Sequence, residues 1–153
     1  MAAILLGVLF ILGWLAVHTM RRGDQLDQGL QKLDFDQIDA ITGPTFERYV
    51  GELLSARGFR NIRYTAASND DGIDILATHD GQKYAIQTKR YAGTLRKGHI
   101  YPVHGAHASK KYACDKAMVV TNSYFTKHAR EYAEMAGVIL VDREELGWWR
   151  EAA

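Results

Sequence analysis

The 153-residue sequence predicts a three-layer α/β/α domain around a mixed β-sheet, preceded by one membrane-spanning helix. Segments of strand length alternate with segments of helical periodicity over residues 43–153. Asp80–Gly81 is a strong hairpin-turn signal between two of these strands, whereas other strands are apolar enough to be buried on both faces. Residues 1–20 contain no Lys, Arg, Asp or Glu, although 24% of the chain is charged. These observations predict the sheet and the anchor.

The charge-free segment is long enough to cross a membrane, because twenty helical residues span roughly 30 Å. A cleaved signal peptide is disfavoured, since no basic residue precedes the apolar run and Ala16–Val17–His18 is a poor cleavage site. A buried core helix would seldom be apolar on every face. Arg21 and Arg22 follow directly, so the positive-inside rule places the rest of the chain in the cytoplasm. We therefore expect a single-pass protein of the inner (cytoplasmic) membrane.

Residues 21–42 are expected to connect the anchor to the domain. Positions 23–42 hold five Asp and one Lys, with apolar residues at intervals compatible with one helical face. One interpretation is a short helix that packs its leucines on the domain. The other is a dimerising stalk, which would make the protein a homodimer, although the heptad pattern is short.

The domain itself, residues 43–153, reads as alternating elements. Thr42 can cap a first helix that contains Pro44 in its first turn and ends at Gly58. Trp148 and Trp149 are expected to cover the end of the core. Between these points we expect strands at 60–66, 73–79 and 83–89, a helix near 100–113, a buried strand at 117–121, a helix at 126–136, a strand at 138–142 and a closing helical turn at 144–149.

Three residues of the predicted hairpin have the chemistry of a phosphodiesterase. Asp74 starts the second strand, and Gln87 and Lys89 lie two residues apart on the third, so their side chains share a face. A hairpin brings the start of one strand beside the end of the other. Carboxylate and amide oxygens can hold Mg²⁺, and an ammonium group can orient or deprotonate the attacking water.

The segments FERYVGELLSARGF, DDGIDILATHDG, AIQTKRY and VVTNSYFTKHAREYAEMAGVILVD closely resemble the Mrr-type restriction endonuclease domain of the PD-(D/E)xK nuclease superfamily. The resemblance runs from about Thr42 to Trp149 and implies metal-dependent cleavage of double-stranded DNA, often foreign or modified DNA. It implies that Asp74, Gln87 and Lys89 are catalytic. It also implies that Glu47, Asp74 and Gln87 hold the metal, Mg²⁺ or alternatively Mn²⁺.

Gln87 departs from the usual acidic residue of this superfamily. A neutral ligand lowers the charge around the ion, and ligand charge tunes metal affinity. Two other functions therefore stay open beside the nuclease. One is a DNA-binding module of the same fold, weakly active or inactive, held at the membrane. The other is a membrane scaffold protein whose partner is another protein.

A basic stretch follows the predicted catalytic strand. Residues 83–116 hold eight Lys or Arg and one Asp, with Tyr91, Tyr101 and Tyr112 interleaved among them. An ordinary solvated face is the alternative interpretation. Thr121–Asn122–Ser123 resembles a family loop that lines the active-site edge, and capping of the next helix explains it almost as well. The residues expected to contact DNA are Arg90, Arg96, Lys97, Lys110 and Lys111.

Overall fold

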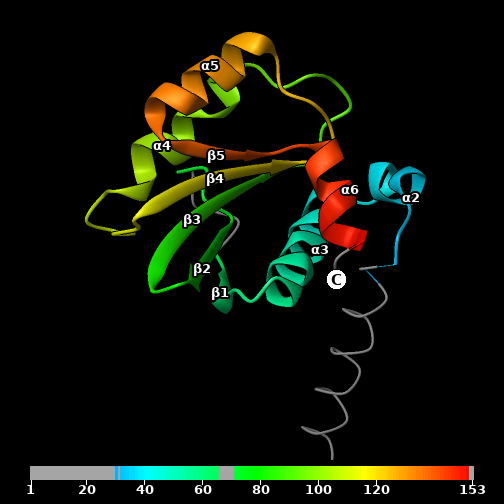
Figure 1. Ribbon diagram of the computed structural model, residues 1–153, viewed down its shortest axis with the longest axis horizontal. Coiled ribbons are helices and arrows are strands. Elements are labelled where there is room, and N and C mark those ends of the chain that lie inside the picture. The colour runs from blue at the N-terminus through cyan, green and yellow to red at the C-terminus, as the bar shows by residue number, and fades with distance from the viewer. Residues whose placement is uncertain (1–29, 31, 66–70, 152–153) are drawn as a thin grey trace, which may run out of the picture.

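A computed structural model describes residues 30, 32–65 and 71–151 (Figure 1). Within this part of the chain the helices are α2 (Phe35–Ala40), α3 (Gly43–Ala56), α4 (Tyr101–His107), α5 (Lys127–Ala136) and α6 (Arg143–Glu151), with a 3-10 turn η1 (Lys97–His99). The strands are β1 (Arg60–Tyr64), β2 (Ile75–His79), β3 (Gln82–Lys89), β4 (Lys116–Thr121) and β5 (Val138–Val141).

These strands form one sheet in the order β1-β2-β3-β4-β5. β1, β2 and β3 pair antiparallel, whereas β3, β4 and β5 pair parallel. The β2–β3 hairpin closes at Asp80 and Gly81, whose φ angles of 48° and 76° are both positive, as the favoured two-residue hairpin turn requires. The mixed sheet expected from the sequence is confirmed.

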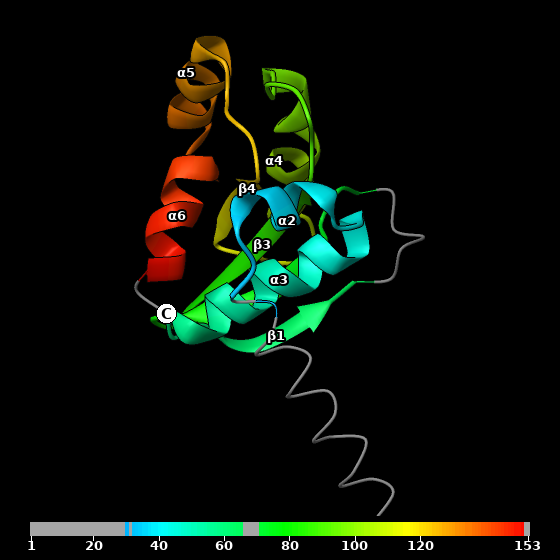
Figure 2. The same ribbon diagram turned by 90° about the vertical axis from the view of Figure 1, so that its right-hand side faces the viewer.

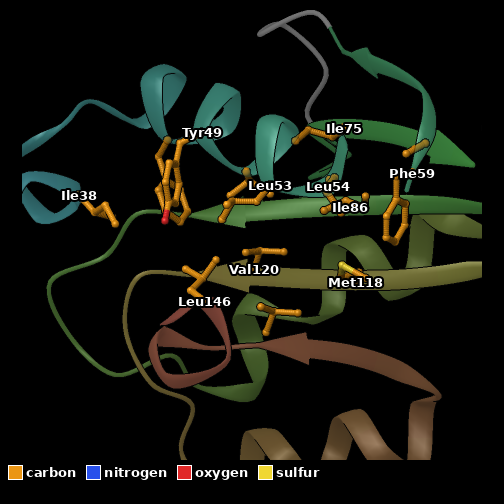
Figure 3. Packing of buried hydrophobic residues seen from close by; sticks show 14 residues of the cluster. Ile38, Tyr49, Leu53, Leu54, Phe59, Ile75, Ile86, Met118, Val120 and Leu146 are labelled. Carbon is orange, nitrogen blue, oxygen red and sulfur yellow. The ribbon is translucent and has the colours of Figure 1, made fainter. Parts of the chain in front are cut away.

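Helices cover both faces of the sheet, so the three-layer arrangement is also confirmed (Figures 1 and 2). One buried cluster, the α3-side core, joins α3, α2 and α6 to one face of the sheet (Figure 3). A second cluster, the α5-side core, joins α4 and α5 to the opposite face. Ile86 of β3 belongs to the first cluster and its neighbour Ala85 to the second, as alternation along a strand requires.

Helix α3 carries the first candidate site residue. Thr42 caps it, with the Thr42 hydroxyl accepting from the Thr45 amide at 3.3 Å, and Pro44 lies in its first turn. Phe46 and Tyr49 are fully buried in the α3-side core and fix the rotation of the helix. Phe46 points into the core, and Glu47 beside it is half-buried.

Two expected helices differ in length from the prediction. The helix expected near 100–113 ends at His107, because the chain then turns to enter β4, where the Asp115 amide donates to the Lys83 carbonyl at 2.9 Å. The closing turn is a longer helix, α6, whose first amides donate to the buried Asp142 carboxylate. Trp149 packs against the α3-side core as expected, but Trp148 is 60% exposed, so that part of the prediction was wrong.

The described part of the expected connector folds onto the domain. α2 begins with an Asp34 cap, and its Ile38 is fully buried in the α3-side core. Among the described residues no helix is long and apolar enough to cross a membrane. The segment 1–20, expected to be the anchor, lies outside the described residues.

Candidate active site

Asp74 lies at the open end of the β2–β3 hairpin, opposite its turn. Its backbone is held on both sides: its amide donates to the Ile86 carbonyl and its carbonyl accepts from the Thr65 amide, each at 2.9 Å. Its carboxylate Oδ2 accepts from the Thr88 amide at 2.7 Å and from the Thr88 hydroxyl at 3.3 Å. The side chain therefore takes the place of a backbone acceptor where the regular pairing of β2 and β3 has ended at Ile75.

Gln87 is the next residue beyond the last regular pair, Ile75 with Ile86, so it lies across from Asp74. Its side chain is 1% exposed, and its Oε1 has no hydrogen-bond partner among the described residues. A buried oxygen without a partner costs about 1–3 kcal/mol, and a bound ion or an ordered water can compensate for that cost.

Gly72 packs directly against Gln87. A Cβ at Gly72 would lie 2.8 Å from Gln87 Nε2 and 2.5 Å from Pro102 Cβ of α4, and the φ of Gly72 is +70°. Both the close approach and the backbone angle require glycine here. The turn before Asp74 is thus closed tightly over the Gln87 amide.

Glu47 of α3 is electrostatically coupled to this group. Burial raises the pKa of the Glu47 carboxyl above its usual range, and the negative charge of Asp74 raises it further, while Arg48 lowers it. The two carboxylates are thus near enough for their charges to repel each other. A cation between them would relieve that repulsion.

Lys89 ends β3 two residues beyond Gln87, with its side chain half-buried. Alternation puts its side chain on the face of Gln87. Its backbone is fixed by β4, since the Thr121 hydroxyl donates to the Lys89 carbonyl at 2.6 Å. The structure therefore brings Asp74, Gln87 and Lys89 to neighbouring positions on two paired strands, as the hairpin predicted.

The donor set suits a hard divalent cation. Asp74 and Glu47 offer carboxylate oxygens, and Gln87 offers the partnerless Oε1. In the described part of the chain no group of three or more His, Cys, Asp or Glu could hold a metal, so the expected ligand set depends on the Gln87 amide as well as on carboxylates. The three residues expected to hold Mg²⁺ or Mn²⁺ fit this role.

The basic stretch is divided by the fold. Lys83 and Lys116 lie at the amino ends of β3 and β4, at the other end of the strands from Lys89. Lys111 pairs with the Asp71 carboxylate, which also accepts from the Tyr112 hydroxyl at 2.9 Å. β3 therefore carries the first basic residues of the stretch to the far end of the sheet from Lys89, and a DNA-binding surface over residues 83–116 stays a prediction.

The remaining basic candidates have different surroundings. Arg96 and Lys97 are exposed beside the first turn of α5 and line a cavity of about 300 Å³ with Thr126 and His128. Arg90 directly follows β3, and its guanidinium donates to the Asp39 carbonyl of α2 at 3.0 Å. Lys110 is exposed in the turn after α4.

Sequence reasoning missed a polar cluster beside Lys89. Asp39 of α2, Asn122 after β4 and Arg143 at the start of α6 are hydrogen-bonded to one another and line a cavity of about 380 Å³ together with Arg90 and Tyr91. The resemblance of the Thr121–Ser123 segment to a family loop was the available signal for Asn122. Nothing in the local spacing marked Asp39 or Arg143.

The class of protein follows from this arrangement. A five-stranded mixed sheet covered by helices on both faces, with an acidic residue, a glutamine and a lysine at the open end of its central hairpin, is the restriction-endonuclease-like fold of nucleases. A family model described as restriction endonuclease (Mrr_cat) matches residues 38–149. The chain belongs to this Mrr-type restriction endonuclease family. No curated protein gives a significant match.

Solved structures of similar fold share little sequence with the chain. AF1548, described as a protein of unknown function, is 21% identical with a TM-score of 0.57, over 66% of this chain and 62% of that one. The modification-dependent restriction endonuclease AspBHI is 22% identical with a TM-score of 0.54, over 82% and 35%. Can2 from Sulfobacillus thermosulfidooxidans, in complex with cyclic tetra-adenylate, is 16% identical with a TM-score of 0.51, over 72% and 34%. The chain thus spans less than two thirds of each of these structures, and at these identities the likeness establishes the fold.

Proposed function

We propose that this chain is a Mg²⁺-dependent DNA endonuclease that hydrolyses phosphodiester bonds of double-stranded DNA. The observation that carries the proposal is the hairpin end, where the Asp74 carboxylate, the buried partnerless Oε1 of Gln87 and Lys89 lie at neighbouring positions. Membership of a restriction endonuclease family supports the same class of reaction. Foreign or modified DNA is the substrate that this family membership favours, as in type IV restriction.

Each residue has a distinct role in the proposed reaction. Oxygens of Asp74, Glu47 and Gln87 would hold the ion, which when bound supplies positive charge at the phosphate and lowers the pKa of a coordinated water. Asp74 is pre-oriented for this because Thr88 fixes one of its oxygens. Lys89 directs its ammonium group toward the scissile phosphate, where it orients the attacking water and offsets the charge that develops on the phosphate oxygens.

Plasmid cleavage tests the proposal directly. The full chain, purified in detergent, should nick or linearise plasmid DNA with Mg²⁺ or Mn²⁺ and not with EDTA. Lys89→Ala should abolish this activity and still retard DNA in a gel, which excludes a contaminating nuclease. Cleavage that persists in Lys89→Ala or in EDTA would contradict the assignment.

One observation favours a second candidate function, a DNA-binding module that does not cut. Only two carboxylates contribute to the described site, and a site with fewer charges binds its metal more weakly. DNA retardation without cleavage at any concentration of Mg²⁺ or Mn²⁺ would support this candidate. A protein that neither binds nor cuts DNA would instead be the membrane scaffold considered from the sequence.

We further propose that residues 1–20 anchor the protein in the cytoplasmic membrane with the nuclease domain in the cytoplasm. The supporting observation is the absence of charge in this segment and the two arginines that follow it. A reporter fused after the last residue should be active in the cytoplasm. Removal of the domain by protease added to intact cells would contradict this topology.

A further inference from the structure

We infer that Asp39, Asn122 and Arg143 form a positioning network that holds the end of β3, and with it Lys89, in place for catalysis. The inference rests on the proposed endonuclease function and extends it to residues outside the metal site. Its basis is a continuous chain of hydrogen bonds that begins on α6, passes through α2 and ends on the backbone two residues after Lys89.

Asn122 makes the contact to the catalytic strand. β3 leaves the sheet after Lys89, and the Tyr91 amide then has no strand partner; it donates to Asn122 Oδ1 at 2.7 Å. The preceding residue of the turn, Thr121, donates its hydroxyl to the Lys89 carbonyl at 2.6 Å. These two hydrogen bonds hold the backbone at Lys89 and at Tyr91, on either side of Arg90. Asn122 is 3% exposed, so water cannot readily replace its amide.

Asp39 fixes which way the Asn122 amide points. Asn122 Nδ2 donates to Asp39 Oδ1 at 2.7 Å, which leaves Oδ1 facing the Tyr91 amide. With the amide turned over, an oxygen would face the carboxylate and an NH₂ group would face an N–H. A charged acceptor at position 39 therefore selects the only orientation that satisfies both bonds.

Arg143 in turn holds Asp39. One guanidinium nitrogen, Nη1, donates to Asp39 Oδ1 and Oδ2 at 2.8 and 2.9 Å and to the Asn122 carbonyl at 2.9 Å. The guanidinium also stacks on Phe35 of α2, with its Cζ 4.3 Å from the ring centroid. Arg143 keeps the pKa of the Asp39 carboxyl below its usual range, so the acceptor stays ionised at neutral pH.

The network ends at the strand terminus that carries Lys89, where Asn122 accepts from the Tyr91 amide and Thr121 donates to the Lys89 carbonyl. A misplacement of about 1 Å at a reacting group can cost roughly 100-fold in rate, whereas contacts to DNA spread over a surface tolerate it. Loss of the network should therefore lower the rate of cleavage more than DNA affinity.

The positioning role is tested by two measurements on the full chain in detergent. One is the rate of single-turnover DNA cleavage, and the other is the affinity for DNA in EDTA. Asn122→Ala should cut at a rate reduced about 10- to 100-fold, with a dissociation constant for DNA within about twofold of wild type. Arg143→Gln removes the far end of the network and should show the same pattern with a smaller loss of cleavage rate. It provides the test if Asn122→Ala does not fold.

Two controls distinguish positioning from general destabilisation. Val138→Ala truncates a buried residue of the α5-side core at the start of β5, and it should lower the melting temperature without lowering the cleavage rate at a temperature where it is folded. Asn122→Asp should be impaired, because two carboxylates then face each other. The double variant Asp39→Asn/Asn122→Asp restores a donor opposite an acceptor between positions 39 and 122 and leaves residue 39 one oxygen for Arg143, so it should recover part of the rate lost in Asn122→Asp.

The outcomes separate this inference from the proposed function. Cleavage at the wild-type rate by both Asn122→Ala and Arg143→Gln would overturn the network while leaving the nuclease intact. Loss of rate in Val138→Ala equal to that in Asn122→Ala, or no recovery in the double variant, would show that the three residues act only on stability. A wild-type protein that does not cut would overturn the proposed function, and the positioning role with it.

Discussion

Replacing Gln87 with Met isolates the buried amide oxygen on which the metal assignment depends. Met has similar length and volume but no oxygen, so Gln87→Met removes a buried polar atom that has no partner among the described residues. The penalty for such an atom is about 1–3 kcal/mol, and we expect the metal-free variant to be more stable than wild type by that amount. For a domain of this size each kcal/mol raises the melting temperature by roughly 3–5 °C.

The response to metal should reverse this order. A ligand that binds only the folded state adds RT ln(1 + [L]/Kd), about 2.7 kcal/mol at a concentration 100 times Kd. The melting temperature of the full chain should be measured in EDTA and then in saturating Mg²⁺. Mg²⁺ should raise the melting temperature of wild type, and it should raise that of Gln87→Met little or not at all. Plasmid cleavage by Gln87→Met should be lost.

Gln87→Glu is the matched comparison, because it keeps the shape and adds a charge. Without metal it should be less stable than wild type, since a third carboxylate would lie beside Asp74 and Glu47. With Mg²⁺ it should gain more stability than wild type and need less metal for cleavage. The reasoning is refuted if Gln87→Met is less stable than wild type in EDTA and responds to Mg²⁺ as wild type does.

Three further results are expected. Asp74→Asn should abolish cleavage but keep the fold, whereas Asp74→Ala should also lose about 1–3 kcal/mol in urea unfolding, because it leaves the Thr88 amide without its acceptor. Glu47→Gln should stabilise the metal-free protein at pH 7: the raised pKa of Glu47 means that its charged form opposes folding above that pKa. This gain in melting temperature should vanish as the pH falls below the ordinary glutamate value, and a gain that persists there would refute it. Lys97→Glu should weaken DNA binding uniformly and reduce the slope of log affinity against log salt by about one, and an unchanged slope would make Lys97 part of a solvated face.

The hairpin that carries the candidate catalytic residues could be predicted because the sequence signals that set it are local. Asp80–Gly81 sets the turn, the turn sets the register, and the register places Gln87 across from Asp74. Alternation then puts Lys89 on the face of Gln87. The sequence did not show that the Asp74 carboxylate serves as a backbone acceptor for β3, because regular pairing was expected to continue through residue 73.

The positioning network could not be predicted, because its members are distant in sequence. Asn122 lies 83 residues from Asp39, and Arg143 lies 104 residues from it. Each looks unremarkable alone: an aspartate in an acidic segment, an asparagine before a helix, and an arginine at a helix start. Only the parallel pairing of β3 with β4 and the return of α6 onto α2 bring them together.

The division of the sheet into an antiparallel and a parallel half also sets an order of assembly. The hairpin joins Asp74 to Thr88 across 14 residues, a loop that closes early, whereas the 104-residue contact between Asp39 and Arg143 must wait for almost the whole domain. The proposed metal ligands can therefore meet while β4, β5 and α6 are still being synthesised. Arg143 can hold Asp39, and through it the Asn122 amide, only when α6 returns to α2. Under the proposed function, a chain still emerging from the ribosome would hold the metal ligands before the positioning network is complete.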